Sequence, residues 1–555
     1  MRENNAHGHT VDPFQCWDVI IAMLANFSTS YNVVNISYVL CMLHQEEELG
    51  NYNKEQENEN VLDDSMCASA ILIGMIIGQL SGGALGDWIG RHGAIALMIV
   101  LQIVSSIGSI FSAPIVSSNV SIFVVLSIWR FVLGIGCGGV YPLAAILTAE
   151  SASSGKERER LVSLTFSTQG VAFLCAPMIT WFLTYVTWSE GENCREGTSN
   201  SILWKIVLGI GCIPGLVVIG ISIHLYSNEG STSQCGIWKS WKTCCERYYL
   251  PVGNKTHADG ANTTTPQNRE MKYSSSSWTL RSISKDSSHD DGPSILPSSE
   301  EETRNQVYFD ANKTNVTEKR TSHFIFTAIL SERKLCQKLC GTALCWFLFD
   351  VLFYGNTLFT PVVLDQAFGN NGTSSSPETN AIFTTARDAT ILALVALPGY
   401  YVSVSTIGQC QTPKFVQCQG FAAMGVLYGI IGLWFERIKQ RQWLLLLLYG
   451  LTFFFANYGP NTTTFMLPSI TFSPSCRATL NGISAACGKL GALLGASMFE
   501  PTAERFGDAT VMIICSGISF MAFFLSWSCL VSHNVSDENE DGSAMVVDMT
   551  DVDDN

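Results

Sequence analysis

An acidic residue lies in the middle of an aromatic stripe in one of the long apolar segments of this chain. Trp346, Asp350 and Tyr354 are four residues apart in the string WFLFDVLFY, so on a helix they share one face. Lys489 lies in another apolar segment, GISAACGKLGALLG. A charge inside a membrane helix costs on the order of 3 kcal/mol or more. Two such charges indicate either a structural ion pair or, as we favour, a site that binds a polar solute.

A glycine-rich string, GGALGDWIGRHG at 82–93, places an acid and an arginine four residues apart between two apolar segments. Asp87 and Arg91 can pair with each other or cap the adjoining helix ends, and so hold one conformation of the protein. The corresponding stretch later in the chain, GQCQTPK at 408–414, has neither the acid nor the arginine.

The elements that must position these residues are long apolar segments. Of the 555 residues, 47 % are hydrophobic and only 14 % are charged, against about 25 % charged in a typical soluble domain. A segment of about 20 apolar residues crosses the hydrocarbon core of a bilayer. We expect twelve membrane helices, at 18–43, 66–86, 93–113, 121–148, 161–186, 203–226, 338–364, 388–408, 416–435, 442–466, 479–498 and 509–531.

The two sets of six helices resemble an internal repeat, because corresponding segments are offset by about 320 residues. We therefore predict an all-α membrane protein with a six-helix half at 1–226, a mostly disordered cytoplasmic linker at 227–336, a second six-helix half at 337–531 and an acidic cytoplasmic tail at 532–555. Two halves of this kind suggest alternating access to a central site.

Basic residues in the loops indicate the orientation of the helices. Lys156, Arg158 and Arg160 lie in one loop, and the central linker is also rich in lysine and arginine, so we expect both on the cytoplasmic side with the two termini. A basic group at 437–441 falls on the outer side and disagrees with this rule. We expect a multi-pass protein of the plasma membrane.

The net charge of −15 belongs to two polar segments. Eight acids and one lysine lie in 44–65, and eight acids without a basic residue lie in 532–555, so the rest of the chain is neutral. The sequence has no basic stripe, so nucleic-acid binding is not expected. The 19 cysteines show no zinc-like spacing, and we expect neither a metal nor a cofactor. No catalytic set or nucleotide loop indicates an enzyme.

The 82–93 string resembles the loop signature of the major facilitator superfamily. Further strings are similar to the phosphate:proton symporter family, which includes the fungal high-affinity and plant inorganic phosphate transporters. They are RFVLGIGCGGVYPLAAILTAE at 130–150, WFLFDVLFY at 346–354, FANYGPNTTTF at 455–465 and NGISAACGKLGALLG at 481–495. The resemblance implies the major facilitator fold and the transport of inorganic phosphate.

The resemblance also assigns residues to a site. The family's phosphate contacts match Tyr141, Gln169, Trp346, Asp350, Tyr354 and Asn461, with Lys489 close by. Hydroxyl, amide and indole groups donate to an oxyanion, and Lys489 adds a positive charge. Ionised Asp350 only accepts, so it suits the O–H of monobasic phosphate and repels sulfate. We predict these seven residues as substrate-binding, and Asp87, Arg91 and Arg130 as gating residues or a conformational latch.

Three carboxylates that the family associates with proton movement are missing. The matching positions hold Thr29, Asn32 and Val140. Since a proton relay needs titratable groups, we expect altered coupling: transport could use protons through Asp350 alone, use another cation, or be uncoupled.

Two other functions fit the sequence. One is a major facilitator carrier for another small anion or an organic solute. The other is a phosphate sensor that transports little, which the missing carboxylates, long linker and acidic tail suggest. Asn119 and Asn371 are glycosylation sequons in predicted outer loops, whereas the sequon at Asn461 lies inside a helix. For Cys244 and Cys245 we favour an unmodified linker over palmitoylation.

Overall fold

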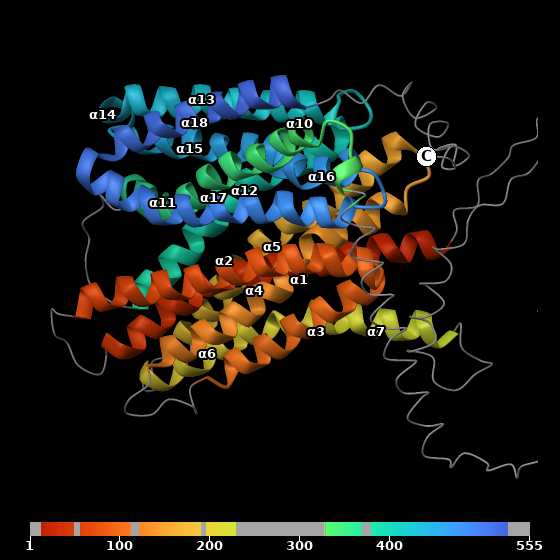
Figure 1. The fold of residues 1–555 in the computed structure, drawn as a ribbon. Coiled ribbons are helices and arrows are strands. Elements are labelled where there is room, and N and C mark those ends of the chain that lie inside the picture. Colours follow the sequence, from red (N-terminus) through yellow and green to blue (C-terminus); the bar gives the residue numbers. More distant parts are fainter. Residues whose placement is uncertain are drawn as a thin grey trace, which may run out of the picture. The chain divides into compact units, whose positions relative to one another are not determined.

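The computed structural model describes residues 13–48, 56–112, 121–189, 196–228, 327, 329–368 and 379–530. These ranges contain twelve helices that are long and apolar enough to cross a membrane (Figure 1). Apart from one bridge between Ile407 and Gln411, the same ranges contain no β-structure. The predicted all-α membrane protein is confirmed.

Six of the spans come before residue 229. They are formed by α1 (Pro13–Glu48), α2 (Gln56–Trp88), α3 (Arg91–Ile110), α4 (Ile122–Glu150), α5 (Gly155–Ser189), and α6 (Glu196–Ile210) together with α7 (Cys212–Asn228). The last two form one span that is interrupted at Gly211, whose carbonyl accepts a hydrogen bond from the Asn32 amide.

The other six spans come after residue 328. Their elements are α10 (Leu335–Leu339), the π-helical turn η2 (Cys340–Leu344), α11 (Cys345–Phe368), α12 (Thr379–Thr406), α13 (Pro413–Leu433), α14 (Phe435–Ile438), α15 (Gln442–Ala456), the π-helical turn η3 (Asn457–Asn461), α16 (Thr462–Thr471), α17 (Arg477–Phe506) and α18 (Asp508–Cys529). The short α14 lies between two spans, and α15, η3 and α16 together form one.

Several helices extend beyond their apolar segments into polar sequence. The fifth helix was expected from residue 161 but begins at Gly155, because the string GKERER continues the helix without being apolar. The acidic segment 44–65 was expected to be a loop, yet α1 continues to Glu48 and α2 begins at Gln56. Glutamate and glutamine are good helix formers, so hydropathy alone makes these helices too short.

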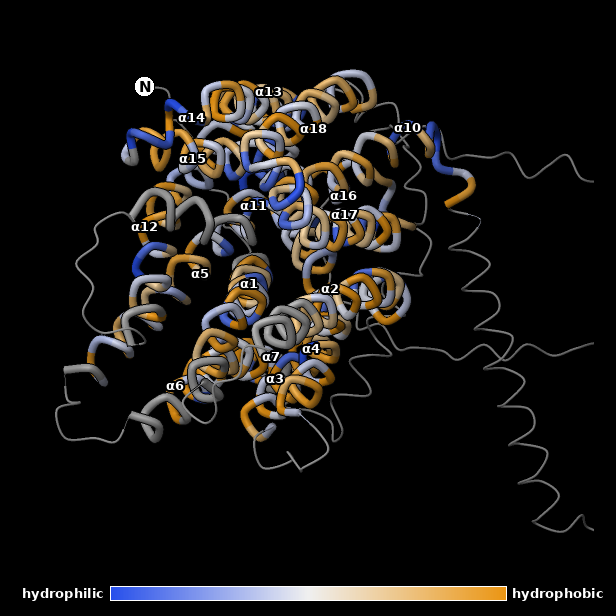
Figure 2. The backbone as a smooth tube through the Cα atoms, turned by 90° about the vertical axis from the view of Figure 1, so that its left-hand side faces the viewer, coloured by the Kyte–Doolittle hydropathy of each residue, from blue (hydrophilic) through white to orange (hydrophobic). Residues whose placement is uncertain are grey.

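Helices from the two sets meet along two seams (Figure 2). One seam joins α5 to α12, and the other joins α2 to α17. At the α2–α17 seam, a Cβ on Gly83 would lie 2.5 Å from the Ala478 carbonyl oxygen, and one on Gly482 would lie 2.3 Å from that of Gln79. Only glycine permits this approach, so these two positions hold the helices backbone to backbone.

Some predictions concern residues outside the described ranges. They include most of the linker, the acidic tail, Asn119, Asn371, Cys244 and Cys245.

Candidate functional site

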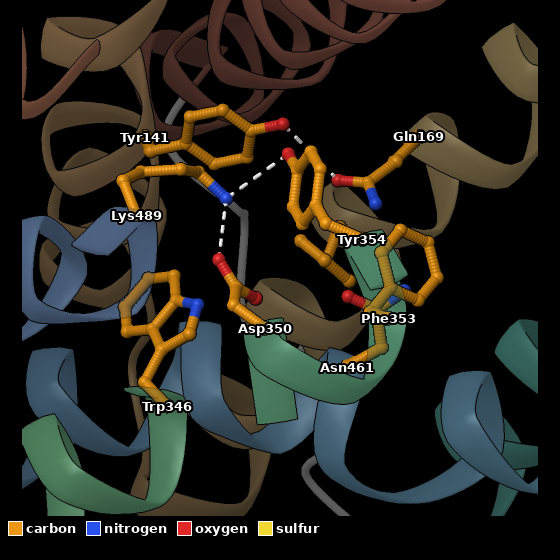
Figure 3. A pocket seen from close by; sticks show the side chains of 9 residues that line it. Tyr141, Gln169, Trp346, Asp350, Phe353, Tyr354, Asn461 and Lys489 are labelled. Carbon is orange, nitrogen blue, oxygen red and sulfur yellow. Dashed lines mark hydrogen bonds and ion pairs between the residues drawn. The ribbon is translucent and has the colours of Figure 1, made fainter. Parts of the chain in front are cut away.

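A small pocket lies between helices that come from both sides of the sequence (Figure 3). Its lining consists of Tyr141 from α4, Phe166 and Gln169 from α5, Trp346, Asp350, Phe353 and Tyr354 from α11, Asn461 from η3 and Lys489 from α17. The structure thus brings together all seven residues predicted to bind substrate, although they are up to 348 positions apart. Their role in binding stays a prediction.

The two charged residues of the pocket form an ion pair. The Lys489 ammonium lies 2.7 Å from the Asp350 carboxylate and donates a second hydrogen bond, 3.1 Å long, to the Tyr354 hydroxyl. It also lies 4.5 Å from the centre of the Tyr354 ring and 5.7 Å from that of Tyr141. Asp350 and Lys489 are only 2 % and 4 % exposed, so each charge needs the other. The pair therefore neutralises itself while facing a pocket.

Helix α17 can present Lys489 to α11 because small residues line its contact face. A Cβ on Gly488 would lie 2.5 Å from Cδ1 of Trp346, and a Cβ on Gly491 would lie 2.1 Å from the Phe347 carbonyl oxygen. The glycines near Lys489 therefore allow the two helices to approach closely, and they leave room for the Trp346 indole against α17. The same face of α11 carries Trp346, Asp350 and Tyr354, as their spacing predicts.

A chain of neutral hydrogen bonds forms the other side of the pocket. The Tyr141 hydroxyl donates to the Gln169 carbonyl oxygen (3.4 Å), and the Gln169 amide donates to the Tyr400 hydroxyl (3.4 Å). The Asn461 amide donates to the same hydroxyl (3.0 Å) and to the Asn457 side chain (2.7 Å). Tyr400 therefore joins an amide of α5 to an amide of η3.

The string around Asn461 produces a kink within one membrane span. Gly459 has non-helical dihedral angles, and Pro460 follows it. The hydroxyls of the next three threonines donate to the carbonyls of Asn457, Gly459 and Pro460. These bonds satisfy backbone groups at the kink inside a membrane, and they turn Asn461 into the pocket. Asn461 is buried, which agrees with its reading as a site residue instead of a glycosylation site.

The sequence did not point to Tyr400 or to the aromatic residues beside the pocket. The Phe166 ring lies 4.6 Å from that of Phe465 and 5.8 Å from that of Tyr400, centre to centre. The pair Tyr400–Tyr401 could not be resolved from sequence, since a buried and a lipid-facing tyrosine look alike there. In the structure Tyr400 is 2 % exposed and Tyr401 is 46 % exposed.

Arg130 lies apart from the residues with which it was grouped as a latch. It is buried between α4 and α1, and it donates to the Asn32 carbonyl (3.0 Å) and to the Asn35 side chain (3.3 Å). It neither lines the pocket nor contacts Asp87 or Arg91.

Neutral groups occupy the three positions where carboxylates were expected by resemblance. Thr29 accepts a hydrogen bond from Gln102 (2.8 Å). The Asn32 amide donates to the carbonyls of Ser28 and Gly211, and Val140 is fully buried.

Asp87 and Arg91 form a polar junction between the two sets of helices. The Arg91 guanidinium lies 2.9 Å from the Asp87 carboxylate and 3.3 Å from that of Glu150. The second oxygen of Asp87 accepts from both the backbone N–H (2.8 Å) and the hydroxyl (2.7 Å) of Thr479. Thr479 is in the first turn of α17, where N–H groups lack helical partners. A carboxylate of α2 therefore caps the N-terminus of α17.

We expect Asp87→Asn to lower the unfolding temperature of the detergent-purified protein by several degrees. Asparagine keeps one acceptor for Thr479 but removes the charge that pairs with Arg91 and faces the N-terminus of α17, where a negative charge is worth about 0.3–1 kcal/mol and up to about 2 kcal/mol when partly buried. Asp508→Asn is a matched control, because Asp508 also occupies the first turn of a helix but does not bridge α2 and α17. Equal shifts for the two variants in a thermal-unfolding assay would contradict the cross-helix cap.

A second polar contact anchors the residues before α10 to the loop between α16 and α17. The Glu332 carboxylate accepts from Lys338 and from the hydroxyl (2.6 Å) and N–H (3.3 Å) of Ser473. Partial burial raises the pKa of Glu332, but the hydrogen bonds from Lys338 and Ser473, together with the Lys338 charge, outweigh it and hold the pKa below its usual value.

This lowered pKa makes the anchor sensitive to acid. A carboxyl whose pKa is lower in the folded than in the unfolded state stabilises the fold above the unfolded pKa, here near 4.5, and loses that contribution as the pH falls through the folded value. We expect Glu332→Gln to lower the unfolding temperature by at most a few degrees at pH 7, with the difference from wild type disappearing in acid. Glu436→Gln, in an exposed pair with Lys439, should change it less at every pH.

Comparison with known proteins supports a membrane transporter. A family model described as "Sugar (and other) transporter" matches residues 18–225. The chain is 28 % identical over 498 residues to "Probable inorganic phosphate transporter 1-9" of Arabidopsis thaliana. The matched region covers 86 % of this chain and 81 % of the relative. It is 26 % identical to "Repressible high-affinity phosphate permease" of Neurospora crassa, over 88 % of this chain and 78 % of the relative.

Solved structures share the fold at low sequence identity. The proton:xylose symporter XylE, of the major facilitator superfamily, matches with a TM-score of 0.60 and 15 % identity, over 94 % of this chain and 96 % of that protein. The human organic anion transporter MFSD10 matches with a TM-score of 0.55 and 14 % identity, over 93 % and 100 %. The predicted major facilitator fold is confirmed.

Proposed function

Because this chain has the major facilitator fold, and because it resembles inorganic phosphate transporters over most of its length, we propose that it carries inorganic phosphate across a membrane by alternating access. The observation that carries the proposal is the pocket. Seven residues assigned from sequence to a phosphate site line it, and they come from five elements, two before and three after the linker at 227–336.

The pocket has the donors and the acceptor that monobasic phosphate requires. Lys489 supplies a positive charge, and the Tyr141 hydroxyl and the amides of Gln169 and Asn461 supply neutral donors. Asp350 accepts, so it can receive a hydrogen bond from a P–O–H group. Sulfate has no such proton at neutral pH, and it would face the carboxylate with an oxygen of like charge.

Alternating access would move one six-helix half, 1–226, against the other, 337–531. The Asp87–Thr479 contact ties α2 to α17 at the end of the bundle that carries Arg91, Glu150 and Glu332. We propose that this end is cytoplasmic, since the basic residues at 156–160, in the first turns of α5, adjoin it. The contact would then close the cytoplasmic side, and its rupture would open the pocket inward. The two termini would also be cytoplasmic, and the protein would lie in the plasma membrane.

Uptake of radiolabelled phosphate into proteoliposomes tests the proposal. We expect saturable uptake that unlabelled phosphate and arsenate inhibit and that sulfate at the same concentration leaves nearly unchanged. Inhibition by an unrelated anion or organic solute but not by arsenate would indicate a different cargo on the same fold. Saturable phosphate binding without flux would indicate a sensor and overturn the transport proposal.

A further inference from the structure

One buried charge in the described part of the chain has no ion-pair partner. Four charged residues are buried there, two cations and two anions: Arg130, Lys489, Asp350 and Asp388. Asp350 pairs with Lys489 at 2.7 Å, and Asp388 pairs with the partly exposed Arg387 at 2.7 Å. Within the described ranges, Arg130 forms no ion pair. Arginine is not deprotonated in proteins, and the charge of Asp388 is already balanced by Arg387, so Arg130 is a buried cation without an ion-pair partner.

The surroundings of Arg130 leave donors unused. Its Nη1 donates to the backbone carbonyl of Asn32 and to the side-chain Oδ1 of Asn35, whereas its Nε and the Asn35 side-chain Nδ2 have no hydrogen-bond partner in the described structure. Both residues are 1 % exposed or less. A buried cation with neighbouring unused donors is favourable only if negative charge enters the same low-dielectric region.

No carboxylate of the described residues lies within ion-pair distance of Arg130, and Asp87 of α2, whose side chain is only 3 % exposed, pairs instead with Arg91 at 2.9 Å. The buried polar side chains of α1, α3, α4 and α5, apart from Arg130, are all serine, threonine, asparagine or glutamine in the described residues. They bond to one another: Ser28 to Gln102, Gln102 to Thr29, and Ser106 to Asn32. None of these groups can take up or release a proton during a transport cycle.

The carboxylate in the pocket is poorly placed to replace them. Asp350 is held by Lys489, and its protonation would leave a second buried cation without a partner. A transported monoanion has the opposite effect, because it brings into the protein one negative charge that offsets the unpaired Arg130.

We propose that this chain moves monobasic phosphate without a coupled proton, so that each cycle carries one net negative charge across the membrane. The inference rests on the proposed function and adds to it the charge state of the substrate and the coupling. In this account Arg130 acts through its positive charge and not through direct contact with phosphate. It lies 11 residues from Tyr141 on α4, about 16 Å along the helix, and attracts the anion without lining the pocket.

The sign of the response to membrane potential tests this proposal. Proteoliposomes of the full chain, with equal pH on both sides, receive valinomycin and a tenfold potassium gradient that makes the interior positive. We expect labelled phosphate to accumulate inside, approaching tenfold at equilibrium. One proton per monoanion would make transport electroneutral and insensitive to the gradient. More than one would make phosphate accumulate only when the interior is negative, and either result overturns the inference.

This design separates the two proposals. If protein-containing vesicles take up no more phosphate than protein-free vesicles at any potential, the proposed function fails. If uptake is saturable but does not follow the expected sign of the potential, only the coupling inference fails.

Two variants of Asn35 test the contribution of Arg130. Asn35→Asp keeps the shape and places a carboxylate beside the guanidinium, whereas Asn35→Leu removes the amide without adding charge. At an interior-positive potential we expect Asn35→Asp to reduce phosphate uptake at least tenfold and Asn35→Leu to stay within threefold of wild type. Size-exclusion profiles check that both fold. Equal uptake by the two folded variants would show that the unpaired charge of Arg130 does not drive anion entry.

Discussion

Asparagine at position 350 is expected to reduce phosphate uptake by the reconstituted protein at least a hundredfold. Asp350→Asn keeps the shape of the side chain but removes its negative charge. The variant loses the acceptor for a P–O–H group, and the amide presents a donor in its place. It also frees the Lys489 ammonium from its 2.7 Å contact, so that the lysine can hold phosphate too tightly to release it. Both effects lower the turnover rate.

If the ion pair had only a structural role, Asp350→Asn would lose uptake for a different reason. Removal of one partner from a buried pair costs about 3–5 kcal/mol of stability, so Asp350→Asn would also lose uptake through misfolding. The double variant Asp350→Asn with Lys489→Met removes both charges and should recover most of the unfolding temperature. If the pair binds substrate, the double variant stays inactive. Recovery of uptake together with stability would assign Asp350 and Lys489 a structural role alone.

The charged centre of the pocket could be predicted from sequence because its energetic cost is local. An acid amid WFLFDVLFY and a lysine amid small residues are expensive in a membrane wherever the helices pack. Helical periodicity then places Trp346, Asp350 and Tyr354 on one face. The structure adds that this face meets Lys489.

The neutral parts of the site were harder to predict. Tyr400 carries no charge, and its neighbour Tyr401 has the same side chain, so only the packing of α12 against α5 distinguishes them. The pairing of Asp87 with Thr479 was also beyond sequence, because it joins residues 392 positions apart. The 82–93 string predicts an acid at a helix end but not which helix that acid caps.

The surroundings of Arg130 could not be predicted from sequence, and its role as a gating or latch residue stays a prediction. It was grouped with Asp87 and Arg91 as a latch, yet the structure places it in a separate polar region of α1 and α4. The sequence has Thr29 and Asn32 where the resemblance implies carboxylates. Only the structure shows that Arg130 is buried and, among the described residues, has no ion-pair partner.

Alanine at position 488 is expected to raise the KM for phosphate at least tenfold. The added methyl group would lie 2.5 Å from Cδ1 and 2.8 Å from Cγ of the Trp346 indole, well inside contact distance. The ring must therefore move, or α17 must shift away from α11. Overpacking of this kind costs about 1–3 kcal/mol. Either movement displaces Trp346 from the pocket or lengthens the Asp350–Lys489 contact, although no polar group has been changed.

Gly517→Ala is the matched control, because a Cβ at that position of α18 meets no atom within 4 Å. Both substitutions favour the helix equally by intrinsic propensity, so their difference reports packing at the pocket. Concentration-dependent uptake should give a wild-type KM for Gly517→Ala. A smaller residue at position 346 should relieve the clash, so Trp346→Phe in the Gly488→Ala background is expected to recover part of the affinity. If Gly488→Ala leaves KM unchanged, the packing of Trp346 against α17 does not determine the affinity for phosphate.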